Sequence, residues 1–397
     1  GRGEKATTSY WAGSGTTIEP LGEVQMPHSL GLLYERVTEY LGFLHSSDEY
    51  KVMALASFGS PTQIDEFRRM VRLGRGGDYS VLPAHLERLF GPRRARGEPF
   101  ERRHFDVARS LQLILEETVL ELARRLRESS GLEHLCLAGG VALNCVMNAR
   151  IRDSGLFREV WVQPAAGDAG TALGSALAVD AAQREPRSRS YRMNDVYLGP
   201  EYSDDEIQQL LDTSRLAYRR LDDVPSAGAE LLSEGKVIGW FQGRMEFGPR
   251  ALGNRSILAS PASPGMQATL NEIKDREDFR PVAPVVLEDR LEEWFTPPVA
   301  SPFMLFVHDV APGKETQVPA IRHVDGTARI QTVNRRQNPR YYDLIAAFGD
   351  RTGVPVLVNT SFNTRGKPMV CSPRDAVECF MTTPLDALII GPYLLQK

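Results

Sequence analysis

The sequence lacks any run of 18 or more apolar residues, and no signal peptide opens it, so we expect a soluble protein without a membrane span. Cysteine is scarce. Cys136, Cys145, Cys371 and Cys379 do not have zinc-finger spacing, and we expect buried free thiols in a reducing cytoplasm. An excess of basic charge is also missing. The net charge of −4 excludes a general nucleic-acid binder but is compatible with a local basic pocket.

The chain has 397 residues, which is enough for about two to three domains, and its 42% hydrophobic and 25% charged residues are ordinary for a globular protein. Residues 105–130 carry an apolar stripe at helical spacing and end at Gly131, so they predict a long helix. Strands are expected at residues 135–138 and 160–162, each followed by a glycine turn and a helix. This order, repeated twice, predicts a parallel α/β core.

The two glycine turns are the first candidate site. Such turns direct backbone N–H groups and helix N-termini toward a ligand phosphate. Gly140 and Asn144 follow the first strand, and Asn144 could contact a bound nucleotide. Asp168 stands between two glycines at the end of the second strand, where a metal-binding or catalytic carboxylate is usual. The alternative is structural: a tight turn at Gly140 and a helix cap at Asp168.

A polar, arginine-rich stretch at residues 181–192 is the expected linker, and we place the domain boundary between residues 184 and 185. Short strands with helices among them then predict an α+β domain with a mixed sheet. The strands are expected at residues 236–241, 303–307, 328–332, 354–358 and 387–390, with Arg329 inside the third. The helices are expected at residues 203–211, 224–233, 341–351 and 373–381. By contrast, residues 72–103 predict an irregular insertion.

Residues 243–284 form a segment rich in glycine, proline and cations, and we expect it to consist largely of loops. Its cations are Arg244, Arg250, Arg255, Lys274, Arg276 and Arg280. On an extended chain Lys274 and Arg276 would project from the same side, with Arg280 sharing their parity. Guanidinium groups bind phosphate oxygens two at a time, so the segment favours a phosphate site. The alternative is a solvated surface on which neighbouring acidic residues balance these charges.

A second polar segment follows the hydrophobic strand at residues 354–358. Within it Ser361 and Asn363 share one side of an extended backbone. Hydroxyl and amide groups joined to cations from elsewhere would make a pocket for a polyphosphate with a small polar group attached. The alternative is a capped turn, for which Asn and Ser are ordinary residues.

These motifs together resemble a known family. Lys274-x-Arg276 and Ser361-x-Asn363 are similar to the tetrad of threonylcarbamoyl-AMP synthase domains. The segments LAGGVALN and GDAG resemble the nucleotide and metal loops of tRNA threonylcarbamoyl-transfer proteins, which have an actin-like fold. Both occur in this order in the ATP-dependent O-carbamoyltransferases of antibiotic tailoring and nodulation-factor synthesis. The phrases PHSLGLLYERVTEYLGF, FGPRALGNRSILASP and DREDFRPVAPVV extend that resemblance over essentially the whole chain.

The resemblance implies that residues 1–184 are the C-terminal part of an actin-like carbamoyl-transfer domain and residues 185–397 a threonylcarbamoyl-AMP-synthase-like domain. The second would make carbamoyl-adenylate from carbamoyl phosphate and ATP, and the first would pass the carbamoyl group to a hydroxyl of a natural product. Mg²⁺ would accompany ATP, and the family makes a homodimer a reasonable expectation. By this resemblance, Lys274, Arg276, Arg280 and Arg329 are catalytic, while Arg250, Arg255, Met304, Ser361 and Asn363 bind substrate or nucleotide. Gly140 and Asn144 hold the adenylate, and Asp168 ligates iron.

The sequence departs from the family at its front. The family has a pair of metal-ligating histidines three residues apart, and none of the seven histidines here forms such a pair. We therefore expect the other iron ligands upstream of residue 1. Two other functions stay open: a tRNA threonylcarbamoylation-type enzyme, and a non-catalytic nucleotide-binding scaffold. For the carbamoyltransferase, Lys274→Ala is expected to abolish adenylation with little loss of stability, as for an exposed or pocket lysine.

Overall fold

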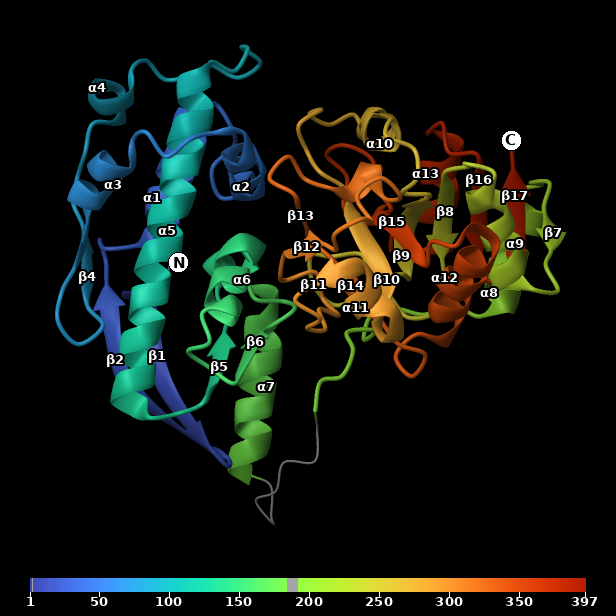
Figure 1. Ribbon diagram of the computed structural model, residues 1–397. Coiled ribbons are helices and arrows are strands. Elements are labelled where there is room, and N and C mark those ends of the chain that lie inside the picture. Colours follow the sequence, from blue (N-terminus) through green and yellow to red (C-terminus); the bar gives the residue numbers. More distant parts are fainter. Residues whose placement is uncertain (2, 184–191) are drawn as a thin grey trace. The chain divides into compact units, whose positions relative to one another are not determined.

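The chain forms two compact units, Gly1–Arg192 and Met193–Lys397, in the computed structural model shown in Figure 1. The structure describes residues 1, 3–183 and 192–397. The predicted boundary between residues 184 and 185, and most of the predicted linker at 181–192, lie outside the described residues.

The first unit is built around helix α5 (Arg102–Ser130), which spans 29 residues and confirms the predicted long helix. Its apolar stripe is buried, and Gly131 ends it in the left-handed conformation at φ 70°, which glycine adopts without a steric penalty. Four shorter helices contact it: α1 (Leu30–Tyr40), α2 (Glu49–Leu55), α3 (Ile64–Met70) and α6 (Cys145–Asp153). The long helix thus supplies the surface on which the other helices bury their apolar sides.

Two parallel strands, β5 (His134–Leu137) and β6 (Glu159–Val162), confirm the predicted parallel α/β core. Each is followed by a turn and a helix. The first turn leads through a 3₁₀ segment (Gly140–Leu143) into α6, and the second leads into α7 (Ala169–Gln183). The main-chain N–H of Gly139 donates to the oxygen of Ala166 at 2.7 Å, so the two turns meet at the same end of the strand pair.

The remaining strands of this unit form hairpins. The strands β1 (Ala6–Ser14) and β2 (Thr17–Gln25) pair antiparallel, as do β3 (Val71–Leu73) and β4 (Tyr79–Val81). Helix α4 (Leu86–Phe90) follows. The prediction that residues 72–103 are wholly irregular is therefore wrong. Tyr79 and Phe90 are buried, and their burial anchors these short elements in an otherwise charged stretch.

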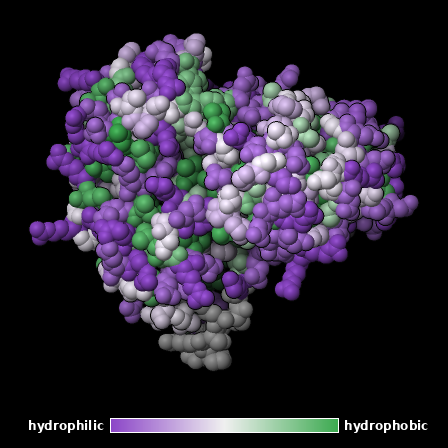
Figure 2. Space-filling view, in the orientation of Figure 1, coloured by the Kyte–Doolittle hydropathy of each residue, from purple (hydrophilic) through white to green (hydrophobic). Residues whose placement is uncertain are grey.

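Apolar residues are more frequent on the surface of the first unit than on that of the second, as Figure 2 shows for one face. In the described part of the chain, no residue of the largely apolar helix α7 is buried, and Leu177 and Val179 are exposed. All four cysteines are free thiols, but only Cys145 and Cys379 are buried. The prediction of buried thiols is wrong for Cys136, which lies exposed on β5.

The second unit contains an eight-stranded mixed sheet, which confirms the predicted fold class. Two pairs are parallel, β10 with β14 and β8 with β16, and the others are antiparallel. The strands, in sheet order, are β14 (Gln331–Val333), β10 (Ala283–Leu287), β15 (Val356–Ser361), β9 (Arg255–Ala259), β8 (Ile238–Phe241), β16 (Ala387–Ile390), β17 (Tyr393–Gln396) and β7 (Arg219–Arg220). The helices of this unit are α8 (Asp204–Thr213), α9 (Val224–Ser233), α10 (Met266–Ile273), α11 (Leu291–Trp294), α12 (Pro339–Thr352) and α13 (Pro373–Met381).

Three of these elements lie wholly or partly in residues 243–284, which the sequence predicted as loops. Strand β9 and helix α10 fall there, and strand β10 begins at its end. Every residue of β9 and of β10 is buried, so neither strand alternates between apolar and polar side chains. Alternation is the sequence signal of a half-buried strand, and it is missing where both faces are covered.

Two predicted strands need correction. Residues 303–307 form no strand, because Met304 has a left-handed φ of 56° that an extended ladder does not tolerate. Residues 328–332 are split between β13 (Thr327–Ala328) and β14, and Arg329 lies between the two strands. The short strand β13 belongs to a separate three-stranded sheet with β12 (His308–Val310) and β11 (Phe295–Thr296).

Helix α12 packs closely on the segment that leads into β9. The ring of Tyr341 lies so near Gly253 that a Cβ atom there would stand 2.2 Å from ring atom Cδ1. Gly253 also has a left-handed φ of 106°. Only glycine fits both the space and the conformation at this position.

We expect Gly253→Ala to lower the free energy of unfolding by about 3 kcal/mol, because overpacking adds to backbone strain. The matched control is Gly235→Ala. Gly235 has a similar φ of 81°, but a Cβ atom there would meet nothing within 4 Å, so only the strain of about 1 kcal/mol applies. Equal losses in the two variants, measured by denaturant unfolding, would contradict the packing argument.

Candidate functional site

The predicted cations and the Ser361 segment meet at one edge of the eight-stranded sheet. Strand β15 ends there, with Ser361 opposite Ser256 near the start of β9. The loop between β8 and β9 begins at the same edge, because Phe241 pairs with Arg255. Strands β10 and β14 are parallel and both start there. Loops carrying Arg250, Lys274–Arg280 and Arg329, far apart in sequence, are thereby brought to a common edge.

Lys274 is the centre of this edge. Its side chain is 6% exposed, and Nζ donates to the main-chain oxygens of Ser361 at 2.5 Å and Asn363 at 3.0 Å. It also contacts Asn363 Oδ1 at 2.6 Å and Ser361 Oγ at 3.3 Å. Ser361 Oγ donates to the same Oδ1 at 2.7 Å, and Asn363 Nδ2 donates to the oxygen of Lys367. Three of the four predicted tetrad residues therefore form one hydrogen-bonded group.

The local backbone differs from the extended chain that the spacing suggested. Lys274 caps the C-terminus of α10, and Asp275 follows with a left-handed φ of 44°. The N–H of Asn363 bonds to the oxygen of Ser361, so the chain turns where the strand ends. The parity argument from an extended chain is thus wrong, although the grouping of Lys274 with Ser361 and Asn363 holds. A non-glycine residue in a strained conformation is a feature frequently found at functional sites.

Burial lowers the pKa of Lys274 well below its usual value, and the neighbouring guanidinium groups of Arg276 and Arg280 lower it further. The charges of Arg276 and Arg280 thus act on the ammonium group in the same direction as burial. A bound anion would offset these effects, because an opposite charge favours the charged form of lysine. A phosphate would be such an anion.

Asn271 on α10 organises the loop that carries these arginines, a role that the sequence did not reveal. It is fully buried, and its Oδ1 accepts from Arg276 Nε at 2.6 Å. Its Nδ2 donates to the main-chain oxygens of Asp278 and Arg280, both at 3.0 Å. Arg280 also forms an ion pair with Glu277 at 3.6 Å. Arg329 is half-buried. Burial is the main cause that lowers the pKa of His323 to about 4, and the charge of Arg329 lowers it further.

Arg255 is placed differently from what was expected. It is fully buried, and its guanidinium donates to the oxygens of Gln242, Gly243, Asn254 and Pro200 while stacking on the Phe241 ring. Burial lowers its pKa to about 10. The terminal nitrogens of Arg255 are thus bound to main-chain oxygens, and its part in nucleotide binding stays a prediction.

The loop that carries Arg250 folds around a buried carboxylate. Glu246 Oε1 accepts from the N–H groups of Leu252 at 2.7 Å, Asn254 at 2.8 Å and Arg255 at 3.3 Å. Burial raises the pKa of Glu246. Sequence reasoning counted Glu246 only among the charges of a solvated surface. A glutamate in a polar segment carries no signal of burial, and only the structure reveals this role.

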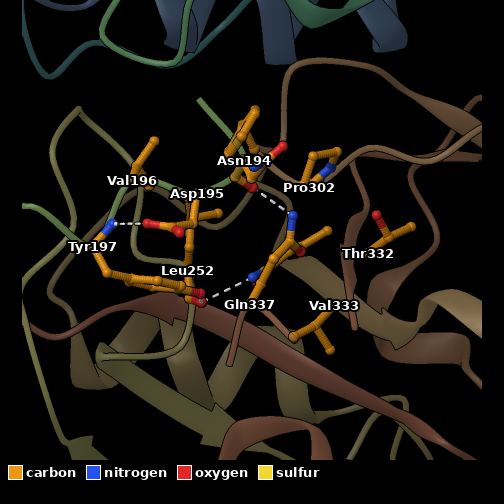
Figure 3. Close-up of a pocket in the computed structure, with 11 residues that line it drawn as sticks. Asn194, Asp195, Val196, Tyr197, Leu252, Pro302, Thr332, Val333 and Gln337 are labelled. Atoms are coloured by element: carbon orange, nitrogen blue, oxygen red, sulfur yellow. Dashed lines mark hydrogen bonds between the residues drawn. The ribbon is translucent and has the colours of Figure 1, made fainter. Parts of the chain in front are cut away.

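A small hollow in this unit is lined by Tyr197, Leu252, Gln331 and Gln337 among others (Figure 3). Its cavity volume of about 10 Å³ is far below the roughly 300–1,000 Å³ of ligand sites. Phe303 also lines it, whereas its neighbour Met304 is buried at 2% exposure. We therefore regard the cationic edge, and not this hollow, as the candidate site for a nucleotide.

In the first unit, Asn144 caps α6, accepting from the N–H of Met147 at 3.0 Å. Its amide also exchanges hydrogen bonds with the amide of Gln112 on α5. Gly140 opens the 3₁₀ segment before α6, with open space around it. Asp168 is exposed in the turn before α7, where its main-chain oxygen accepts from Thr171. The ligand-binding roles of Gly140, Asn144 and Asp168 therefore stay predictions.

The residues present do not by themselves fit an iron site. Asp168 supplies one carboxylate, and no group of three or more His, Cys, Asp or Glu side chains suited to a metal is found in the part of the chain that the structure describes. A non-haem iron site needs several such ligands. We derive no chemical step through a metal.

In the residues that the structure describes, no helix is long and apolar enough to cross a membrane.

Comparison with known proteins identifies the family. A family model named carbamoyltransferase N-terminus matches residues 1–177, and one named carbamoyltransferase C-terminus matches residues 229–397. Nodulation protein NolO of Bradyrhizobium diazoefficiens is 46% identical over 97% of this chain and 72% of its own length. An uncharacterized protein of Synechocystis sp. is 44% identical over 100% and 72%, and nodulation protein NolNO of Sinorhizobium fredii is 45% identical over 100% and 60%.

The chain belongs to the carbamoyltransferase family. It spans about 60–72% of the length of these relatives. Among solved structures, HypF of T. kodakarensis is similar at 18% identity over 45% of this chain and 22% of its own, with a TM-score of 0.30. Full-length HypF in a phosphate- and nucleotide-bound form gives 15% identity, 60% and 36% coverage, and a TM-score of 0.31. Scores this low carry no argument about this chain.

The burial of Lys274 changes the expected effect of its substitution. Lys274→Met leaves the oxygens of Ser361 and Asn363 buried without their donor, which we expect to lower the free energy of unfolding by about 1–3 kcal/mol. The control is Arg365→Met, because Arg365 and its partner Asp275 are mostly exposed and such pairs contribute about 0–1 kcal/mol. If Lys274→Met lowers the free energy of unfolding no more than the control does, Lys274 is a pocket lysine with little part in stability.

The stability contributed at Lys274 is also expected to depend on pH. Because its pKa is lowered in the folded protein, the unfolded chain binds more protons between that lowered pKa and about 10.5. The free energy of unfolding therefore rises with pH across this interval. We expect the difference between wild type and Lys274→Met to grow as pH rises toward 10.5 in denaturant titrations. A difference that stays constant would mean that the lysine titrates alike in both states.

Proposed function

We propose that the chain is an ATP-dependent O-carbamoyltransferase whose second unit forms carbamoyl-adenylate from carbamoyl phosphate and ATP. The observation that carries the proposal is the buried Lys274, bonded to Ser361 and Asn363 and accompanied by Arg276 and Arg280. Membership of the carbamoyltransferase family supports carbamoyl transfer as the reaction class.

The proposed chemistry balances with one water. Water cleaves carbamoyl phosphate to carbamate and phosphate, and a carbamate oxygen then attacks the α-phosphate of ATP. A new O–P bond forms, and pyrophosphate leaves. The acceptor hydroxyl finally attacks the carbamoyl carbon, so that AMP leaves and the hydroxyl proton is released. A site that excludes water would protect the reactive adenylate.

The cations have separate tasks in this scheme. Lys274, Arg276, Arg280 and Arg329 would stabilise the charge that develops as pyrophosphate leaves, since preorganised donors act strongly where water is excluded. Arg250 would bind the phosphate of carbamoyl phosphate, and Ser361 and Asn363 would orient the nucleotide. The main-chain bend at Met304 would shape the pocket. Mg²⁺, entering with ATP as part of the substrate, would offset part of the charge on the phosphates.

The transfer step is proposed for the first unit, on the strength of the family alone. Gly140 and Asn144 lie at the turn expected to hold the adenylate, and Asp168 at the neighbouring turn. The acceptor would be a small molecule with a hydroxyl group, which is the class that the resemblance to the family implies.

Release of phosphate and pyrophosphate from carbamoyl phosphate and ATP tests the proposal. We expect the wild-type chain to release both in equal amounts, and Arg276→Met to reduce the rate at least about 100-fold, since removing one transition-state donor has that effect in other enzymes. Arg290→Met is the control, because Arg290 is exposed and bonds only Glu293 among the described partners. Pyrophosphate release that does not require carbamoyl phosphate, or an Arg276→Met variant as active as the control, would contradict the assignment.

A further inference from the structure

A chain of two side-chain amides lies beneath the loop that carries Arg250. Gln331 Nε2 on β14 donates to the main-chain oxygen of Leu252 at 2.8 Å, an atom that Figure 3 includes. Gln331 Oε1 in turn accepts from Asn359 Nδ2 at 2.7 Å, and the same Nδ2 donates to the main-chain oxygen of Ala251 at 3.2 Å. Both N–H bonds of the Asn359 amide are therefore used.

These partners fix which way the Asn359 amide points. A main-chain oxygen can only accept, so Ala251 requires a donor from Asn359, and Leu252 requires a donor from Gln331. Turning either amide over would place two acceptors against each other. The carbonyl oxygen Oδ1 of Asn359 is thus held in a single orientation, as an acceptor.

That acceptor has no hydrogen-bond partner among the described residues, although Asn359 is only 1% exposed. A buried acceptor left unsatisfied costs about 1–3 kcal/mol, and such groups in native proteins call for an explanation. The neighbouring strand residues Leu357 and Val358 are apolar and buried, and the contacts with Ala251 and Gln331 use only the amide nitrogen of Asn359, so they leave Oδ1 unexplained. The polar side chain and its fixed orientation are consistent with a donor that arrives with a ligand.

The position of Asn359 connects it to the cationic edge. It lies two residues before Ser361 on β15, so both side chains project from the same face of the strand, about 7 Å apart along it. It pairs with Ala283 at the start of β10, three residues after Arg280. Solvent does not reach Oδ1, so a ligand meets it only after a shift of the surrounding segments. Ala251 accepts from the amide nitrogen of Asn359 and directly follows Arg250, so an anion bound by Arg250 would act on a segment in contact with this amide.

We propose that Asn359 determines specificity for the carbamoyl group, with Oδ1 accepting a hydrogen bond from its NH₂. The inference rests on the proposed function. An acyl phosphate with a methyl in place of the amine would leave this acceptor unpaired, and sites built to bond a polar group reject analogues that lack it. The residue thereby distinguishes carbamoyl phosphate from acetyl phosphate, which has nearly the same shape and charge.

The test compares dissociation constants of carbamoyl phosphate and acetyl phosphate by calorimetric titration of the full chain. We expect Asn359→Leu to weaken carbamoyl phosphate binding about tenfold, the equivalent of one hydrogen bond, and to leave acetyl phosphate binding within about twofold. Asn359→Ser serves as the second variant should the leucine variant not fold. Gln331→Met is the control, because it disturbs the same amide chain but retains Oδ1 and its anchor on Ala251.

The ratio of the dissociation constants of carbamoyl phosphate and acetyl phosphate distinguishes a specificity role of Asn359 from a structural one. A purely structural role would weaken both ligands by the same factor, and this result, or no change in either, would overturn the assignment of Asn359. A change of ratio in Gln331→Met as large as in Asn359→Leu would overturn it as well. The proposed function is judged separately, by whether the wild-type chain releases phosphate and pyrophosphate. If it does and the ratio is unchanged, only the inference about Asn359 fails.

Discussion

The contact between the Lys274 ammonium and the oxygens of Ser361 and Asn363 is the interaction on which the rest of this site depends. It joins the end of α10 to the end of β15, two segments 87 residues apart in the chain. The ammonium is buried with other cations near it, an arrangement that is unfavourable until an anion is present. The side-chain and main-chain oxygens that bond the lysine are uncharged. A phosphate bound nearby would supply the missing anion.

Buried polar residues hold the loops around this contact in place. Glu246 folds the loop of Arg250 by accepting from three main-chain N–H groups, and Asn271 fixes the loop of Arg276 and Arg280. Such networks rigidify a site when every member is bonded. Asn359 Oδ1 has no partner among the described residues, although the nitrogen of the same amide bonds both Gln331 and Ala251. A ligand donor would complete this group.

The sequence predicted the elements whose pattern is local. Helix α5 has an apolar stripe and a terminal glycine, and α12 and α13 begin at Asn338 and Ser372, residues that cap them. The sequence did not predict strands β9 and β10, because both of their faces are buried and their residues do not alternate between apolar and polar. The irregular course of residues 303–307 escaped because a single left-handed residue, Met304, overrides an apolar run.

For the site, the resemblance to a family located the tetrad, and the structure brings Lys274, Ser361 and Asn363 into direct contact. The spacing argument grouped residues that lie together, but its assumption of an extended backbone was wrong, since the chain turns at Asp275 and Asn363. For Arg255, by contrast, the sequence did not reveal what surrounds the side chain. A cation in a basic segment gives no sign in the sequence of whether it faces a ligand or, as here, main-chain oxygens. The sequence did not predict the roles of Glu246, Asn271 and Asn359, because a single buried polar residue forms no periodic pattern.

The central claim is that the second unit activates a carbamoyl group as an adenylate. Exchange of labelled pyrophosphate into ATP by the wild-type chain tests it most directly, because the exchange needs reversible formation of an enzyme-bound adenylate. The account predicts exchange that appears with carbamoyl phosphate and is absent with acetyl phosphate or with ATP alone. ATP binding without exchange in the presence of carbamoyl phosphate would contradict it.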